Sequence, residues 1–170
     1  MNANEEAAIF DRQDQPAEAA HAYETAITNS EADLNTYINL AVLYFVCQDF
    51  GYAAHHNVPD AFRLTAWDRA GELLDGAKRR FGSQPEIDFW RRYFAFAFLG
   101  DPPFYPEAER LAQTGRTLVP YLHLITGPRP ERYRQQATKL LESVNAGLTA
   151  RERYIKSVVE SALSAGSSHK

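Results

Sequence analysis

Small and aromatic residues recur 34 positions apart in the first third of the chain. Three pairs of positions show this recurrence: Ala7 with Ala41, Phe10 with Tyr44, and Ala19 with Ala53. A fixed period of about 20–50 residues is typical of repeat architectures, in which each unit buries its apolar face against the next one. The recurrence therefore predicts a stack of similar units, an architecture suited to holding a partner.

The repeated units are expected to be helical, because apolar residues fall three and four positions apart and strict alternation is nowhere sustained. Proline and glycine separate these runs, as they do at helix starts and ends. We expect helices over residues 4–12, 17–28, 34–48, 60–81, 86–99, 106–114, 117–125 and 130–146, with a last one after Thr149. The sequence thus predicts an all-α fold, an array of antiparallel helical hairpins.

The last helix has the clearest start signal. Thr149 followed by Glu152 forms a capping box, in which each side chain satisfies a backbone donor of the first turn. Apolar residues then follow at helical spacing: Tyr154, Ile155, Val158, Val159 and Ala162. A helix of this kind commonly closes the open end of a repeat stack, so we expect a C-terminal capping helix.

Composition fits one folded domain over residues 1–163, followed by a flexible polar tail over residues 164–170. The chain has 170 residues, 45% hydrophobic and 24% charged, which are ordinary values for a globular protein. Its longest apolar runs are much shorter than the ~20 residues of a membrane span, and the first residues do not resemble a secretory signal. We therefore expect a cytoplasmic protein without a membrane partner. Cys47 is the only cysteine, so an internal disulfide is excluded.

Charge is distributed unevenly along the chain. Residues 1–85 hold 6 Lys and Arg against 13 Asp and Glu, and residues 86–170 hold 12 against 9. The balances of −7 and +3 give the two halves different electrostatic surfaces. A surplus of three positive charges is small for nucleic acid, whose binding depends on many phosphate contacts. We expect no nucleic-acid partner.

The segment up to residue 54 resembles the tetratricopeptide repeat, a 34-residue unit of two helices. In the first helix of that unit, an aromatic, a leucine, a small residue and a second aromatic recur at the spacing of Tyr37, Leu40, Ala41 and Tyr44. In the second helix, alanines flank an aromatic as Ala19 and Ala26 flank Tyr23. Leu99-Gly100-Asp101 resembles the turn between the two helices of a third unit. The resemblance implies two to three degenerate units.

In this family the first helix of each unit lines a concave groove that holds a peptide. The resemblance implies groove residues in two sets: Asn35, Ile38, Val42, Phe45 and Val46 in the second unit, and Ile87, Trp90, Phe94, Ala97 and Phe98 in the third. Because these residues are mostly apolar, the implied ligand is a hydrophobic peptide or an amphipathic helix. The alternative is that the same residues are core, since aromatic residues at helical spacing usually are.

The sequence favours a non-catalytic interaction protein, such as an adaptor, an assembly factor or a dedicated chaperone, with no cofactor. One alternative is a small inhibitor or immunity-type protein that masks a single target. A second copy of the chain is a further candidate partner, which would make the protein a homodimer. The basic segment Arg129, Arg132, Arg134 and Lys139 either grips an acidic partner or is a solvated face.

A metal-dependent enzyme is the competing class. His55, His56 and Asp60 include the ligand types that zinc uses. However, no His-Glu-x-x-His pattern or cysteine pair accompanies them. Two solvated histidines in a turn and a helix-capping aspartate are the simpler interpretation. Cys47 lies in an apolar run and is expected to be a buried thiol.

Overall fold

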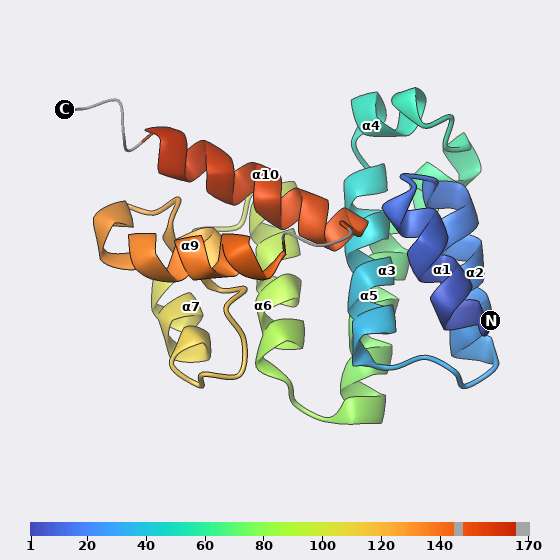
Figure 1. Ribbon diagram of the computed structural model, residues 1–170, viewed down its shortest axis with the longest axis horizontal. Coiled ribbons are helices and arrows are strands. Elements are labelled where there is room, and N and C mark those ends of the chain that lie inside the picture. The colour runs from blue at the N-terminus through green and yellow to red at the C-terminus, as the bar shows by residue number, and fades with distance from the viewer. Residues whose placement is uncertain (145–147, 166–170) are drawn as a thin grey trace. The chain divides into compact units, whose positions relative to one another are not determined.

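The computed structural model describes residues 1–144 and 148–165, and over these residues it contains helices and no strand (Figure 1). The helices are α1 (Ala3–Arg12), α2 (Pro16–Thr28), α3 (Leu34–Cys47), α4 (Phe50–His55), α5 (Asp60–Phe81), α6 (Pro85–Phe94), α7 (Tyr105–Ala112), α8 (Tyr121–Leu124), α9 (Arg134–Ser143) and α10 (Ala150–Ala165). A π-helical turn covers Ala95–Leu99 and a 3₁₀ turn covers Pro130–Tyr133. The all-α fold is confirmed. The array of repeat-like hairpins and its capping helix stay predictions.

The chain divides into two compact units. Among the described residues, the first unit holds 1–82 and 148–151, and the second holds 83–144 and 152–165. A single domain over residues 1–163 stays a prediction. The tail expected over residues 164–170 lies outside the described residues, apart from Ser164 and Ala165, which end α10.

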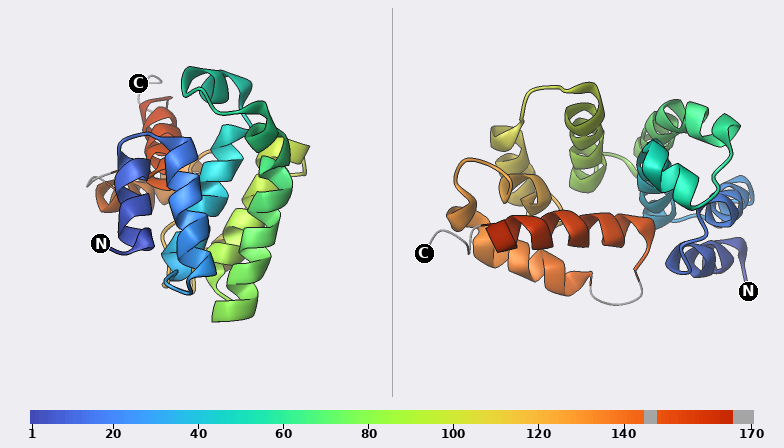
Figure 2. Two further views of the ribbon diagram at one scale, coloured as in Figure 1. Left: turned by 90° about the vertical axis from the view of Figure 1, so that its right-hand side faces the viewer. Right: turned by 90° about the horizontal axis from the view of Figure 1, so that it is seen from above.

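In the first unit, α1 packs on α2, α2 on α3, and α3 on α5, as both views in Figure 2 show. Ala19, Ala26 and Ala41 have no exposed surface. Small side chains at these positions let the helix backbones approach closely. Larger buried side chains, Tyr23 and Leu40 among them, fill the grooves on either side.

Local signals place the starts of these helices. Asn2 and Glu5 form a capping box before α1, and Asp33 and Thr36 form another before α3. Pro16 occupies the first position of α2, because a backbone N–H is not needed there. Gly82 ends α5 with a φ of 74°, a conformation that glycine adopts without strain.

In the second unit, α6 carries a buried aromatic cluster. Phe89 and Trp90 have no exposed surface, and the rings of Phe89 and Tyr93 stack with their centroids 5.4 Å apart. Helix α7 packs against α6 and α8, and α8 packs against α9. This unit is therefore built around aromatic side chains, whereas the core of the first unit contains many alanines.

Three sequence expectations are wrong in detail. The apolar spacing over residues 60–81 predicts that Leu64 shares a buried face with Leu74 and Ala77, but Leu64 is 71% exposed. The helix expected over residues 117–125 shortens to α8, because the residue before Pro120 is disfavoured in α conformation. The α-helix expected over residues 86–99 ends at Phe94 and continues as the π turn. Of the helix expected to reach residue 146, positions 145 and 146 lie outside the described residues.

Candidate functional site

Most of the residues expected to line an apolar groove are buried. Ile38, Val42, Ile87 and Trp90 have no exposed surface, and Phe94 is 3% exposed. A partner has no access to these five side chains in this structure, since they fill the interiors of their own units. Phe45 and Val46 are half-buried, whereas Asn35, Ala97 and Phe98 are exposed. A binding role for the exposed and half-buried residues stays a prediction.

The first unit contains a cleft lined mostly by polar residues instead, with a volume of about 380 Å³. Its walls are α1 and the beginning of α3, and Tyr23 of α2 contributes as well. We call it the amide cleft, because three asparagines line it. The lining residues are Asn4, Glu5, Ala8, Ile9, Arg12, Tyr23, Asp33, Asn35, Thr36 and Asn39. Sequence analysis identified only Asn35 of this set as a binding residue.

Helical geometry places these side chains together. Asn4, Ala8 and Arg12 lie four positions apart and so share one face of α1. Asn35 and Asn39 have the same spacing on α3. The Thr36 hydroxyl lies 2.7 Å from Asn4 Oδ1, to which it can donate, and this contact joins the two walls. The Thr36 backbone N–H also donates to Asp33 Oδ1 at 2.8 Å, which fixes the start of α3 beside the cleft.

A buried carboxylate binds Tyr23, one of the side chains that line the cleft. Asp11 has no exposed surface; its Oδ2 accepts from the Tyr23 hydroxyl at 3.0 Å, and its Oδ1 accepts from the backbone N–H of Ala150 at 2.7 Å. Burial raises the pKa of Tyr23, and the charge of Asp11 and the hydrogen bond to it raise that pKa further. Tyr23 is therefore a neutral phenol that donates to Asp11. The sequence signal for the buried Asp11 is its position, four residues after Ala7, which is also buried.

Asn39 has an incompletely satisfied carboxamide. Its Nδ2 donates to the Tyr23 hydroxyl oxygen at 3.4 Å, while its Oδ1 is buried with no hydrogen-bond partner among the described residues. Leaving such an acceptor unpaired costs about 1–3 kcal/mol. Asn35 is exposed and accepts from Arg151 Nη2 at 3.3 Å. The cleft thus offers amide donors and acceptors, which are groups suited to recognition.

The histidine turn does not form the metal set considered from sequence. His56 Nε2 lies 2.8 Å from Asp14 Oδ2, and its Nδ1 lies 2.9 Å from the backbone oxygen of Tyr52. Asp60 is the first residue of α5 and pairs with Arg63 at 3.6 Å. Across residues 1–144 and 148–165, no three His, Cys, Asp or Glu side chains are grouped so that they could hold a metal ion.

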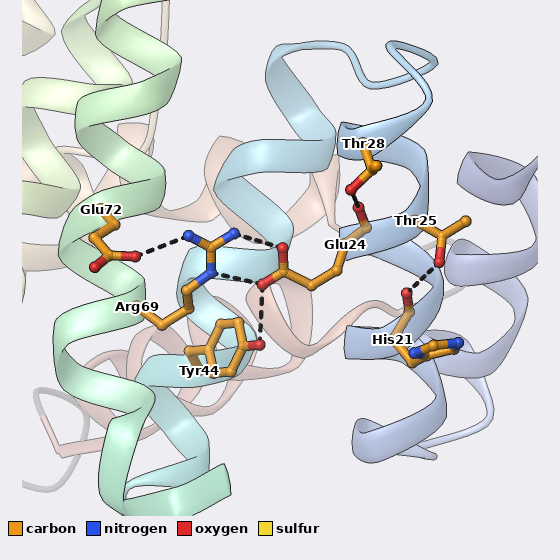
Figure 3. A network of polar contacts seen from close by, with 7 residues as sticks. All are labelled: His21, Glu24, Thr25, Thr28, Tyr44, Arg69 and Glu72. Atoms are coloured by element: carbon orange, nitrogen blue, oxygen red, sulfur yellow. Dashed lines mark hydrogen bonds and ion pairs between the residues drawn. The ribbon is translucent and has the colours of Figure 1, made fainter.

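The charged groups of one ion-pair network in the first unit bind one another (Figure 3). Arg69 Nε donates to Glu24 Oε1 at 2.7 Å, and Arg69 Nη2 donates to Glu24 Oε2 at 2.5 Å. Arg69 Nη1 donates to Glu72 Oε2 at 2.8 Å, and the Tyr44 hydroxyl donates to Glu24 Oε1 at 3.1 Å. The hydrogen bond to Glu24 is the main reason that the pKa of Arg69 is raised. The network ties α2, α3 and α5 together and leaves little capacity for a ligand.

Comparisons of the chain with protein-family models, with curated proteins and with solved structures find no match. Within the described residues, no helix combines the length and the apolar character needed to cross a bilayer.

Proposed function

We propose that this chain is a non-catalytic protein-binding module, and that its amide cleft holds an extended peptide segment of the partner. The observation that carries this proposal is the set of three asparagine side chains on two adjoining helices. An extended backbone presents N–H and C=O groups with no internal partner. A carboxamide offers both a donor and an acceptor, so it complements either group.

The lining favours recognition over chemistry. Carboxamides neither titrate nor act as nucleophiles, and the Tyr23 phenol is held neutral. Asn39 lines the cleft and its Oδ1 has no hydrogen-bond partner among the described residues, so this carboxamide has unused capacity as an acceptor. The position of α1 and α3 along the cleft also agrees with the resemblance to the tetratricopeptide repeat, because in that family the first helices of successive units line the groove.

Charge favours a basic peptide. Among the described residues of the first unit there are 7 Lys and Arg against 13 Asp and Glu, a net charge of −6. Glu5 and Asp33 lie in the cleft lining together with Arg12, so the charged side chains of the lining sum to −1. An excess of one sign speeds the arrival of an oppositely charged partner, in a manner sensitive to salt. The partner segment is therefore extended and carries Lys or Arg.

The test begins with peptides selected from a random displayed library against the whole chain. Binding of each selected peptide is then measured by fluorescence anisotropy with two variants: Asn35→Ala, which removes an exposed amide, and Ala8→Trp, which fills the cleft. Ala61→Trp adds the same bulk at an exposed position of α5 and is the matched control. Circular dichroism verifies that each variant is folded.

We expect Ala8→Trp to weaken binding at least tenfold and Asn35→Ala to weaken it several-fold, with Ala61→Trp unchanged. Selected peptides should be enriched in Lys and Arg, and their affinity should fall as salt rises. Equal binding by the wild type and folded Ala8→Trp would show that the cleft is not the site.

A further inference from the structure

The second unit has a cavity of its own, which the proposed function does not use. Its volume is about 230 Å³, and it is lined by Tyr105, Pro106, Glu109, Leu124, Pro128, Arg129, Arg132 and Tyr133. Two tyrosines, two prolines and a leucine supply the apolar part of its walls. Three charged side chains, Glu109, Arg129 and Arg132, lie among them. We call it the arginine cavity.

Two of the three charges in the arginine cavity neutralise each other. Arg132 Nη1 lies 3.2 Å from Glu109 Oε1. The Tyr133 hydroxyl donates to the same carboxylate oxygen. Glu109 is therefore occupied by a cation and by a phenol. Burial is the main reason that the pKa of Tyr133 is raised. The hydrogen bond to Glu109 and the charge of Glu109 raise this pKa further, whereas the charges of Arg132 and Arg129 lower it.

Arg129 supplies the remaining charge. Its guanidinium makes no hydrogen bond or ion pair with any other residue that the structure describes. Pro128 precedes it and Pro130 follows it, so the backbone on both sides has restricted freedom. Arg129 itself has φ −131° and ψ 58°. The restrained backbone lowers the conformational entropy that this segment loses when Arg129 binds an anion.

The apolar wall at Tyr105 is also fixed before any ligand arrives. The Tyr105 ring stacks on buried His123, with centroids 4.6 Å apart and planes 15° apart. Its edge lies against Gly127, where an added Cβ would come within 2.8 Å of Tyr105 Cε1. Gly127 is therefore needed for the close approach, and the ring has little room to turn. The cavity is preformed on this side.

We propose that the arginine cavity binds a small organic monoanion: a carboxylate attached to a flat apolar group. The carboxylate pairs with Arg129, whose planar fork matches it with two parallel hydrogen bonds. The flat group lies against the tyrosine and proline side chains. The charges of the cavity sum to +1, which a monoanion balances, whereas a phosphate dianion would leave excess negative charge beside Glu109. Drug-sized ligands occupy cavities of about 300–1,000 Å³, so this ligand is smaller.

This chemistry has two sources, a free aromatic acid and the terminal carboxylate of a chain that ends in an aromatic residue. Isothermal titration calorimetry on the full chain distinguishes them with four probes: benzoate, the neutral benzamide, a short peptide ending in phenylalanine, and the same peptide amidated at its C-terminus. The variants are Arg129→Met and Gly127→Ala. Arg116→Met, an exposed arginine of the same unit with no ion pair to another described residue, is the matched control.

We expect saturable binding of benzoate or of the peptide acid, with the matching amide at least tenfold weaker. Arg129→Met should lower the affinity for the acid at least tenfold, and Gly127→Ala should lower this affinity several-fold by displacing Tyr105. Arg116→Met should leave the affinity unchanged. Binding of benzoate alone assigns the cavity to a small metabolite, and binding of the peptide acid assigns it to a chain terminus. No saturable binding of either acid, equal binding of acid and amide, or indifference to folded Arg129→Met would overturn the proposal. None of these outcomes depends on the amide cleft.

Discussion

At the scale of single residues, alanine sets how closely the helices of the first unit approach. Ala41 has no exposed surface, and α3 packs on both α2 and α5. Ala41→Leu adds volume where no space exists, and overpacking of this kind costs about 1–3 kcal/mol. We expect the free energy of unfolding in urea to fall by that amount. Ala54→Leu makes the same change at an exposed position of α4 and should shift it by less than about 0.5 kcal/mol. An equal loss in both variants would contradict this account of the alanines.

The reactivity of the Cys47 thiol tests whether the same interior is closed to solvent. The thiol is free and has no exposed surface. Burial raises its pKa to about 12, with smaller contributions from the charges of Asp11 and Asp14. Because the thiolate is the reactive form, a disulfide reagent at pH 8 should react with the native chain far more slowly than with the urea-unfolded chain. Comparable rates in the two states would show that Cys47 is accessible.

At the scale of elements, Asp11 connects α1 to α2 and to the first turn of α10. It accepts from the Tyr23 hydroxyl and from the Ala150 N–H. Asp11→Ala leaves both donors buried without this acceptor, and each such group costs about 1–3 kcal/mol. We expect a lower free energy of unfolding and faster hydrogen exchange at the Ala150 amide.

Tyr23→Phe separates the two contacts of Asp11, because it removes one donor and leaves the bond to Ala150. This variant should lose less stability than Asp11→Ala and should keep the Ala150 amide protected. Asp68→Ala, an exposed change on α5, is the control. Unchanged exchange at Ala150 in Asp11→Ala would show that the acid does not hold this turn.

Elements with strong local signals were the ones that sequence could predict. The apolar spacing, Pro16 and Gly82 place α2 and the end of α5 correctly, because capping and backbone restriction act within a few residues. The bond from Asp11 to Ala150 joins positions 139 apart in the chain, and no local pattern specifies it. The amide cleft was missed for a similar reason. Asn35 and Asn39 show their shared face of α3, but only packing reveals that α1 lies opposite them.

At the scale of the whole molecule, the change in charge along the chain falls close to the boundary between the two units, near residue 82. The first unit carries the negative charge and the amide cleft, and the second carries Arg129 and the arginine cavity. The two proposed sites therefore differ in sign as well as in shape. A basic peptide and a small carboxylate are complementary to different units of one chain.

The stability of the folded chain should also depend on pH through His123. This residue has no exposed surface, and its ring stacks on Phe104 with centroids 4.2 Å apart. Its Nε2 accepts from the Phe104 N–H at 3.2 Å, so a neutral ring carries its proton on Nδ1. That nitrogen has no hydrogen-bond partner among the described residues. Burial, with a smaller contribution from the charge of Arg92, lowers the pKa of His123 from 6.5 to about 4.

The sign of the effect follows from which state binds the proton. Between pH 6.5 and about 4, the unfolded chain protonates His123 while the folded chain does not, so acid favours unfolding. Each pH unit in this window costs about 1.4 kcal/mol, and the whole window costs about 3 kcal/mol. The contribution is complete above pH 6.5 and is lost as the pH falls toward 4. Urea unfolding from pH 7.5 to 5, above the range where most carboxylates titrate, measures it. His123→Phe should flatten this dependence, whereas His21→Gln, a change at an exposed histidine, should not. An unchanged slope in folded His123→Phe would place the pH dependence elsewhere in the chain.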